Sequence, residues 1–263
     1  SAPTSIAPPF LPPRPNKESG MRERPILFSG PMVRAILSGN KTQTRRAAKL
    51  PHNNPLGQWE PTTVGGPGVR YADGTPVPVQ AAIWHTRTGD GLFCPYGQPG
   101  DRLWVREAVR GEEQADGLDG VRYLADNAFM PIGDNNASAD AWLILHRYRG
   151  KRSATVPPMH MPRWACRLVL EVTRVRVERL NEISASDCWA EGIEECDGSL
   201  DEMEICRLAK LMGRTFEDPH PSYAALWEQI NGADSWTANP WVWVVEFEPV
   251  AHSKQLNDGG TDA

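Results

Sequence analysis

The apolar residues of one long strand-like segment, CRLVLEVTRVRVERL, change face halfway along it. Leu170 and Val172 are even-numbered, whereas Val175 and Val177 are odd-numbered. Successive side chains of a strand point to opposite faces of a sheet, so a core-facing pattern survives this change only if the strand contains one extra residue. We therefore predict a β-bulge or a barrel corner near Thr173.

The last apolar segment, NPWVWVVEFEPV, alternates with a period of two residues. Trp241, Trp243, Val245 and Phe247 fall on one face, which predicts a closing strand with an aromatic core face. Amphipathic helices that stop at a glycine are predicted for residues 30–39, 182–192, 199–213 and 221–232. Strands separated by helices and turns, without a βαβ rhythm, favour an α+β fold: a small mixed β-barrel with helices packed on it.

Long irregular segments divide the chain. Residues 1–20 contain six prolines and no apolar period, so we expect a disordered or extended tail there and a second disordered tail at 251–263. Residues 21–250 are expected to form a single domain. Within it, 47–98 is rich in turn residues and 111–160 is irregular apart from the apolar patch AWLIL. Both are too long for ordinary connections and are interpreted as insertions, the first as an insertion or a lid.

Composition excludes several classes of protein. We expect no membrane span, because no apolar run approaches about eighteen residues, and we expect no secretory signal. Five cysteines without a CxxC pair argue against a disulfide framework or a zinc knuckle and fit a reducing cytoplasm. The six histidines never pair at metal-ligand spacing, so no metal is expected. The net charge of −5 gives no global attraction to nucleic acid, so such a contact needs a local basic patch.

One polar stretch, SGNKTQTRR, places a lysine close to a threonine. A threonine hydroxyl is a poor nucleophile until a base removes its proton, and a lysine is such a base only if burial or positive charge lowers its pKa. Lys41 precedes Thr44 by three residues, and Arg45 and Arg46 supply positive charge. Because residues three apart face opposite sides of a flat strand, the two converge only if the backbone turns, as Gly39 allows. The alternative is a solvated loop after a helix.

Two glutamates lie at unusual positions. Glu191 is the last residue before a helix-ending glycine, where the negative end of the helix dipole is expected to raise its pKa and suit it to donate or shuttle a proton. The alternative is an exposed surface glutamate. Glu107 interrupts the strand LWVREAV, where it is expected to orient Lys41 or an arginine, or to pair structurally with Arg102 or Arg106.

A basic stretch with an aromatic residue, Trp164, offers a second kind of contact. Its arginines could follow the phosphates of a nucleic acid while the tryptophan stacks on a base. They are Arg163, Arg167, Arg174, Arg176 and Arg179. Glutamates are interleaved at Glu171, Glu178 and Glu182. We therefore predict a solvated, salt-bridged strand.

Four motifs, in their order along the chain, resemble the ASCH family, a branch of the PUA-like β-barrels. AILSGNKTQTRR matches that family's Gly-x-Lys-x-x-Thr-x-Arg signature at Gly39, Lys41, Thr44 and Arg46. GDRLWVRE, ISASDCWAEGI and NPWVWVVEFE follow in the expected order, and HMPRWACRLVLEVTRVRVERL is similar to the longer versions frequent in bacteriophage and prophage genomes. The resemblance covers about half the chain. It implies an α+β, PUA-like mixed β-barrel with packed helices and two long insertions.

The resemblance also implies an activity. Small bacterial members are amidohydrolases that remove the acetyl group from N4-acetylcytidine and related acylated cytosines through a lysine, a threonine and a glutamate. These residues map onto Lys41, Thr44 and Glu191, which are also the residues with unusual sequence positions described above. We therefore expect a metal-independent amidohydrolase without a cofactor, acting on a small-molecule nucleoside in the cytoplasm of a bacterium or phage-infected host.

The remaining site residues are expected to bind the substrate. Arg46 and nearby backbone N–H groups would stabilise the oxyanion, with Arg45 and Glu107 beside them. Trp104 and Trp241 are candidates for stacking on the base, although tryptophans in strands are more often part of the core.

Two alternatives from other classes stay open. The first is a PUA-like module that binds RNA or modified nucleic acid without breaking a bond, in which Lys41, Arg45 and Arg46 contact phosphate. The second is a phage accessory or assembly factor whose insertions bind a partner protein. Salt dependence separates the first from the enzyme, because phosphate contacts weaken steeply as salt rises.

Overall fold

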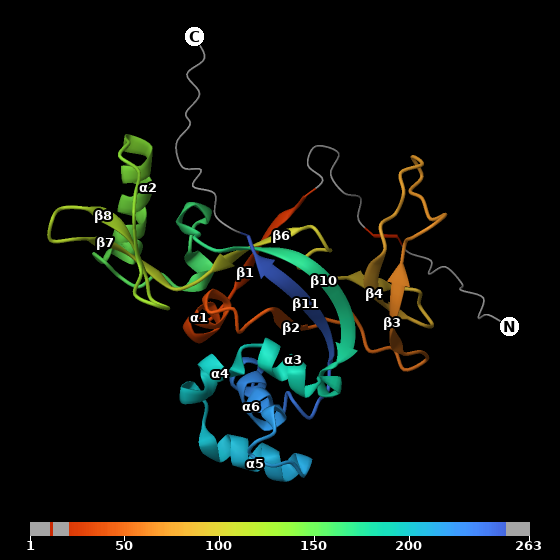
Figure 1. Cartoon of the computed structure of the whole chain (residues 1–263). Coiled ribbons are helices and arrows are strands. Elements are labelled where there is room, and N and C mark those ends of the chain that lie inside the picture. Colours follow the sequence, from red (N-terminus) through yellow and green to blue (C-terminus); the bar gives the residue numbers. More distant parts are fainter. Residues whose placement is uncertain (1–10, 13–20, 251–263) are drawn as a thin grey trace.

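Strands from distant parts of the sequence meet in one central sheet, with helices below it (Figure 1). The computed structural model describes residues 11–12 and 21–250. The tails expected at 1–20 and 251–263 therefore lie outside the described residues, apart from Leu11 and Pro12.

The central sheet has five strands in the order β1-β6-β10-β11-β2. Strands β1 and β6 run parallel, and the other neighbours are antiparallel. The strands are β1 (Glu23–Leu27), β2 (Gln43–Ala47), β6 (Arg102–Arg106), β10 (Val169–Arg179) and β11 (Trp241–Pro249). The mixed α+β class predicted from the sequence is confirmed.

The sheet is open, and this corrects the expectation of a closed barrel. Strands β1 and β2 occupy its opposite edges, and no backbone ladder joins them within the described part of the chain. Helix α1 (Gly30–Leu37) connects these edges. The Arg46 side chain reaches across, with Nη2 donating to the Leu27 carbonyl at 2.7 Å. The sheet does not close because a helix and a side chain, rather than paired backbones, lie between its edges.

The change of face in β10 is a β-bulge, as predicted. The register between β10 and β11 shifts between Val172 and Arg174, which makes Thr173 the extra residue. Before the bulge, β10 also pairs with β6. After it, the strand continues along β11 and curves towards the helices (Figure 1). One strand thus carries charged residues from the upper part of the sheet to the region of α3.

Strand β11 is buried on both faces rather than on one. Trp243, Val245 and Phe247 are buried as expected, but Val242 and Val244 on the opposite face are also fully buried. Residues of both faces belong to the larger cluster of buried apolar side chains, so both faces of β11 are covered. Alternation in the sequence identified the strand but underestimated its burial.

The four predicted helices form, and their glycine ends are confirmed. Gly39, Gly192 and Gly213 all have positive φ angles just after a helix. The helices that follow β10 are α3 (Ala185–Ala190), α4 (Ile193–Cys196), α5 (Glu202–Met212) and α6 (Pro219–Asn231). Short 3₁₀ turns lie at Tyr148–Gly150, Pro158–His160, Arg163–Ala165, Leu180–Glu182 and Asp197–Ser199.

Each stretch interpreted as an insertion folds into a small antiparallel sheet. The first has the order β3-β4-β5 and the second the order β7-β8-β9, packed against helix α2. Their elements are β3 (Trp59–Val64), β4 (Gln80–His85), β5 (Gly91–Phe93), β7 (Val109–Glu113), β8 (Asp119–Tyr123), β9 (Phe129–Pro131) and α2 (Asn136–His146). The apolar patch AWLIL lies in α2. The two small sheets flank the central sheet on opposite sides (Figure 1).

Two clusters of buried apolar side chains hold these parts together. The larger joins the central sheet to α1 and to the helices after β10. The smaller joins the second insertion to the start of β10 and includes Val109, Val121 and Tyr123. The Tyr123 hydroxyl donates to the Ala165 carbonyl at 2.8 Å, so the smaller cluster also contains a satisfied polar group.

Candidate functional site

The stretch SGNKTQTRR runs between the ends of two helices. After α1 ends, Gly39 has a φ of +84° and turns the chain. The Lys41 N–H then donates to the Ala35 carbonyl of α1 at 2.9 Å, and the Thr42 N–H donates to the Ala190 carbonyl of α3 at 2.9 Å. These two bonds fix the stretch against both helices before β2 begins.

Glu191 follows α3 directly beside this stretch. Gly192, with a φ of +77°, turns the chain away after it. A Cβ atom on Gly192 would lie 2.7 Å from the Cβ of Ala35 and 2.9 Å from the Cβ of Lys41. Glycine is therefore needed here twice over, for its left-handed backbone and for the close approach to Lys41.

Lys41 and Glu191, selected from the sequence as members of one site, form a buried ion pair. The Lys41 Nζ lies 2.9 Å from the Glu191 Oε2 and also donates to the Glu191 backbone carbonyl at 2.7 Å. The two side chains are 0% and 5% exposed. The alternatives of a solvated loop and an exposed surface glutamate are therefore wrong.

Burial lowers the pKa of Lys41 below its usual 10.5. The positive charge of Arg46 lowers it further, whereas the Glu191 carboxylate opposes the shift through its charge and hydrogen bond. Lys41 is thus an enclosed amine that holds its proton less firmly than a surface lysine.

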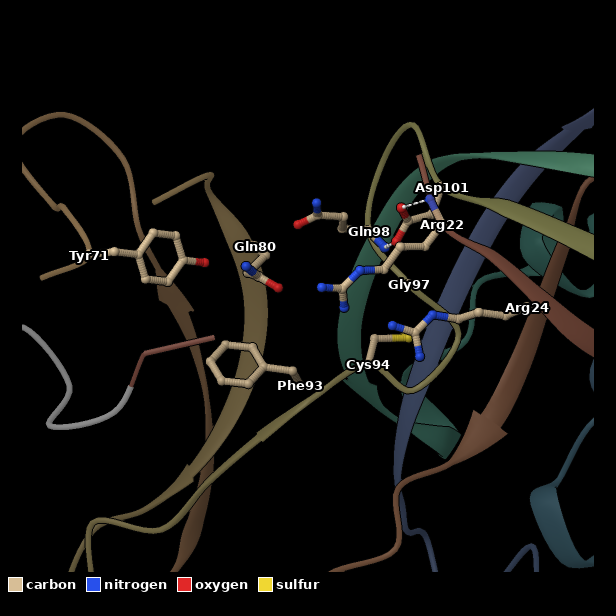
Figure 2. Close-up of a pocket in the computed structure, with 9 residues that line it drawn as sticks. All are labelled: Arg22, Arg24, Tyr71, Gln80, Phe93, Cys94, Gly97, Gln98 and Asp101. Atoms are coloured by element: carbon tan, nitrogen blue, oxygen red, sulfur yellow. Dashed lines mark hydrogen bonds between the residues drawn. The ribbon is translucent and has the colours of Figure 1, made fainter. Parts of the chain in front are cut away.

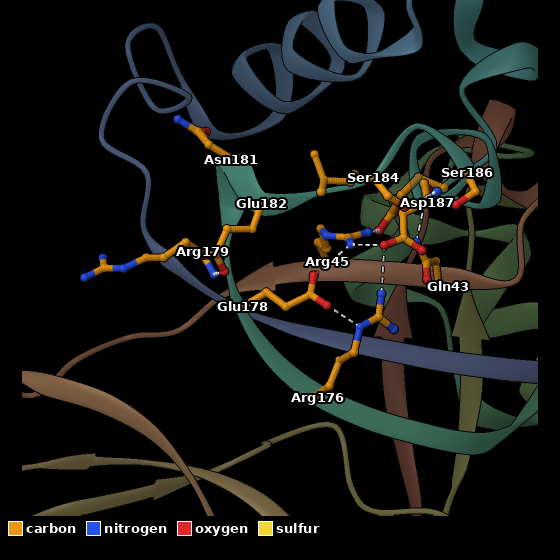
Figure 3. Close-up of polar contacts among 12 residues, drawn as sticks. Gln43, Arg45, Arg176, Glu178, Arg179, Asn181, Glu182, Ser184, Ser186 and Asp187 are labelled. Carbon is orange, nitrogen blue, oxygen red and sulfur yellow. Dashed lines mark hydrogen bonds and ion pairs between the residues drawn. The ribbon is translucent and has the colours of Figure 1, made fainter.

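Arg45 brings a second positive charge to Glu191. Its Nη1 lies 3.2 Å from the Glu191 Oε1. Its Nη2 lies 2.8 Å from the Asp187 Oδ2 and 3.0 Å from the Glu178 Oε2 (Figure 3). Burial by itself would lower the pKa of Arg45, but the nearby acidic groups, Glu191 foremost, raise it overall. Glu191 therefore lies between two buried cations.

Charged residues beyond Arg45 belong to the same network, although no sequence pattern marked them as site residues. The Asp187 Oδ2 accepts from Arg45 and, at 3.0 Å, from the Arg176 Nη2, and Arg176 also pairs with Glu178 (Figure 3). The Asp187 N–H donates to the Ser184 Oγ at 3.1 Å at the start of α3, whereas its carboxylate binds the arginines. The alternation of Arg and Glu in β10 predicted salt bridges, but it did not predict which other element these side chains face.

Thr44 and Glu191 share the wall of a narrow pocket between β2 and α6. Its volume is about 50 Å³. The wall consists of Met32, Thr44, Arg45, Arg46, Ala47, Glu191, Tyr223, Leu226, Trp227, Ile230 and Asn231. Lys41 does not line this wall and is joined to it through its ion pair with Glu191. Sites for drug-sized ligands measure about 300–1,000 Å³, so this pocket admits a few atoms of a substrate rather than a whole nucleoside.

Tyr223 of α6 is a pocket residue that the sequence analysis missed. Burial raises its pKa well above the usual 10.0, and the charge of Glu191 adds to the rise. Its hydroxyl is therefore neutral at physiological pH. The only sequence signal for Tyr223 was the amphipathic pattern of α6. That pattern predicts a buried side chain and does not distinguish a pocket residue from a core residue.

The two tryptophans expected to stack on the base lie away from this pocket. Trp104 on β6 is flanked by Arg106 and Arg163, whose guanidinium carbons lie 5.1 and 5.7 Å from the ring centroid. Trp241 at the start of β11 has Arg179 over its ring at 4.1 Å. Neither ring lines the pocket. Both tryptophans instead stack with arginines of the fold.

Glu107 pairs with Arg167 rather than with Lys41 or an arginine of its own strand. The Arg167 Nε and Nη2 lie 2.8 and 2.9 Å from the two carboxylate oxygens. Glu107 is only 1% exposed, because it follows β6 into the smaller core, where its N–H meets the Met161 Sδ at 3.2 Å. Burial raises the pKa of Glu107, and Arg167 opposes the rise. The structure thus separates Glu107 from the Lys41 site.

Other spaces lie along the first insertion. One, of about 50 Å³, lies between Tyr71 and Gln80 of the first insertion on one side and Arg22 with the turn before β6 on the other (Figure 2). There the Asp101 carboxylate accepts from the N–H groups of Arg22 and Gln98 at 3.0 and 3.1 Å, so it stabilises the turn. A shallower groove of about 540 Å³ runs between β4 and β10 and includes Arg174. None of the eight site residues selected from the sequence lines either space.

The described residues contain no cluster of His, Cys, Asp or Glu with the geometry to hold a metal ion. Among the helices between residues 21 and 250, none is long and apolar enough to cross a membrane.

Comparison with protein-family models, with curated proteins and with solved structures found no match to this chain. Within the stretch GNKTQTR, side-chain contacts join Lys41 to Glu191, and Thr44 lines the same pocket wall as that glutamate.

Proposed function

We propose that this chain is a PUA-like protein of the ASCH type and an amidohydrolase. Its substrate would be a nucleoside or base, such as N4-acetylcytidine, that carries an acyl group on its exocyclic amine. One observation supports this proposal above the others. Lys41 and Glu191, 150 positions apart in sequence, form a 2.9 Å ion pair that is shielded from water and adjoins a pocket lined by Thr44.

The first chemical step makes Thr44 a nucleophile. Transfer of the shared proton from Lys41 to Glu191 leaves a neutral amine and a neutral carboxylic acid. The lowered pKa of Lys41 favours this transfer. The Thr44 hydroxyl proton then reaches this amine through the Glu191 carboxyl, which lines the pocket with Thr44 and passes its own proton back to Lys41, while Oγ1 attacks the acyl carbonyl. The oxyanion that forms is stabilised by Arg46 and nearby backbone N–H groups, with a well-placed donor contributing about 3 kcal/mol.

The second step releases the amine. Glu191 gives its proton to the exocyclic nitrogen as the C–N bond breaks, and the acyl group stays on Thr44 as an ester. Water then attacks the ester, which releases the carboxylic acid and restores the hydroxyl. Atoms balance, since amide and water become amine and acid. This chemistry requires neither a metal nor a redox cofactor.

The size of the pocket restricts how a substrate binds. A volume of about 50 Å³ suits a short acyl group, whereas a base and ribose need more room. We therefore place the acyl group inside the pocket and the base at its mouth. The α6 residues Leu226 and Ile230 in the wall would then limit the length of the acyl chain.

Mass spectrometry of purified protein with a panel of N-acylated nucleosides tests the proposal. Thr44→Ala is expected to lower kcat/KM by at least about 1,000-fold, because the nucleophile is lost. Thr42→Ala is the matched control, since Thr42 is exposed two residues earlier, and it is expected to retain activity within about twofold. Turnover of no N-acylated nucleoside by the folded wild type, or full activity in Thr44→Ala, would contradict the proposal.

The binding-module alternative is less well supported at this site. It requires Lys41, Arg45 and Arg46 to contact phosphates, but the first two side chains are 0% exposed and already engaged by carboxylates. A phosphate would have to displace those carboxylates from the protein interior. The assembly-factor alternative stays a prediction, which a pull-down with the intact chain would test.

A further inference from the structure

One part of the chain carries positive charge without a single acidic residue. Residues 141–170 contain six Lys or Arg and no Asp or Glu, although the whole chain has 33 acidic residues against 28 basic ones. Such a local excess on an acidic protein is a physical reason to look for a polyanionic partner.

Two of these six cations are neutralised within the fold. Arg167 pairs with Glu107 and with Asp126, both at 2.8 Å. Arg163 pairs with Glu23 at 2.8 Å. These two arginines join the second insertion and the start of β10 to the rest of the molecule, so they are not available to a partner.

The other four cations form one exposed run, RYRGKR, which we call the cationic turn (residues 147–152). It contains Arg147, Arg149, Lys151 and Arg152, all exposed. None of the four forms an ion pair with any residue that the structure describes. The chain reverses within the run, where Arg149 and Gly150 have φ angles of +53° and +74°. Four unneutralised charges are therefore gathered in a single tight turn.

Helix stabilisation explains only part of the cationic turn. Arg147 directly follows α2, and a cation there interacts favourably with the helix dipole. That effect fades within the last turn of a helix, so it does not extend to Lys151 or Arg152. Lys151 and Arg152 therefore add electrostatic repulsion within the turn and do not stabilise the fold.

Aromatic rings lie against the cationic turn. The guanidinium carbon of Arg149 is 5.3 Å from the centroid of the Tyr148 ring, and the His160 ring is 5.8 Å from Tyr148. His160 is exposed, and Trp164 shortly after it is 37% exposed. Bases of a single strand stack on such rings, whereas a duplex presents mainly its phosphates.

We propose that the cationic turn, together with His160, binds single-stranded nucleic acid. The four cations would contact consecutive phosphates, and the exposed ring would stack on a base. This surface follows α2, which lies on the far side of the central sheet from α6 (Figure 1). The pocket with Thr44 is instead lined by residues of α1, β2 and α6, together with Glu191. The proposal does not depend on the amidohydrolase activity. It also differs from phosphate binding by Lys41 and Arg45, which are buried.

Fluorescence anisotropy with a fluorescein-labelled oligodeoxythymidylate of about 20 nucleotides tests this surface. Four phosphate contacts predict a slope of about −2.8 in log K against log salt, which is about a 50-fold loss of affinity between 50 and 200 mM salt. The variant carrying Arg147→Gln, Arg149→Gln, Lys151→Gln and Arg152→Gln is expected to bind at least about tenfold more weakly at 50 mM, with a slope near zero. His160→Ala is expected to weaken binding about fivefold or more.

A charge-matched variant separates local from global electrostatics. Lys49→Gln, Arg70→Gln, Arg87→Gln and Lys210→Gln remove the same four charges from other exposed positions and are expected to change affinity less than about threefold. Unfolding curves of both variants check that each is folded. The proposal is overturned if the wild type fails to bind at 50 mM salt, or if both quadruple variants lose affinity equally. Binding that is tenfold tighter to a duplex, or that occurs only on phosphatidylserine vesicles, would also overturn it.

Discussion

At the scale of single residues, the most demanding feature is a carboxylate between two buried cations. Glu191→Gln would leave both Lys41 and Arg45 without this charge, and we expect it to lower the free energy of unfolding by about 3–5 kcal/mol. Lys41→Met removes a charge that burial disfavours and leaves Glu191 paired with Arg45. We therefore expect it to lower the free energy of unfolding by only about 1–2 kcal/mol. Urea unfolding at pH 7 measures the difference.

Glu194→Gln is the control for this comparison, because Glu194 is exposed three residues after Glu191 and should change stability by less than about 0.5 kcal/mol. Equal losses for Glu191→Gln and Lys41→Met would show that the buried charges are not what makes this position sensitive.

At the same scale, the sequence predicted the members of the site better than their surroundings. Lys41 and Glu191 were selected because a lysine near a threonine and a glutamate at a helix end are chemically unusual, and the structure pairs them. Trp104 and Trp241 were selected only as aromatic residues. Stacking on an arginine and stacking on a base demand the same ring, so residue type alone did not distinguish the two roles.

At the scale of elements, the end of α3 is more constrained than the end of α5. Gly192→Ala would force a left-handed alanine and a Cβ atom 2.7 Å from that of Ala35, and we expect a loss of about 3 kcal/mol. Gly213 also has a left-handed φ but nothing within 4 Å of a built Cβ, so Gly213→Ala is expected to cost about 1 kcal/mol. Thermal unfolding of the two variants measures their loss of stability. Similar losses for Gly192→Ala and Gly213→Ala would contradict the role of close packing at Gly192.

Helix ends were predictable because their rules are local, whereas the small sheets were not. Ser184 and Gly192 mark the limits of α3 through caps that depend on neighbouring residues alone. Pro61 lowers the strand propensity of WEPTTV, yet it pairs in register with Ile83. Proline is tolerated there because β3 is an edge strand of its sheet. Which strand forms an edge is decided by tertiary pairing, which no local pattern contains.

At the scale of the whole molecule, a buried ion pair joins the two segments that flank the second insertion, and their separation in sequence concealed it. Glu107 and Arg167 are 60 positions apart. Patterns along the chain identified each as a charged residue in or near a strand. Their meeting depends on β10 pairing with β6, which brings the two segments to the smaller core.

Arg167→Leu is expected to show how much this attachment depends on charge. It would leave the Glu107 carboxylate, 1% exposed, without its bidentate partner, so we expect a loss of about 3 kcal/mol at pH 7. Burial already raises the pKa of Glu107 above its unfolded value, and losing Arg167 raises it further. At pH values above the unfolded pKa of Glu107, the folded variant therefore binds more protons than the unfolded variant. Its stability falls as pH rises, so part of the loss seen at pH 7 is regained at pH 5.

The control is Arg163→Leu, which breaks a bidentate pair with Glu23. The two side chains of that pair are 47% and 37% exposed, so its loss should lower the free energy of unfolding by less than about 1 kcal/mol at either pH. Urea unfolding of both variants at pH 5 and pH 7 measures these differences. If both variants lose the same free energy of unfolding at both pH values, packing rather than the buried charge joins the two segments that flank the second insertion.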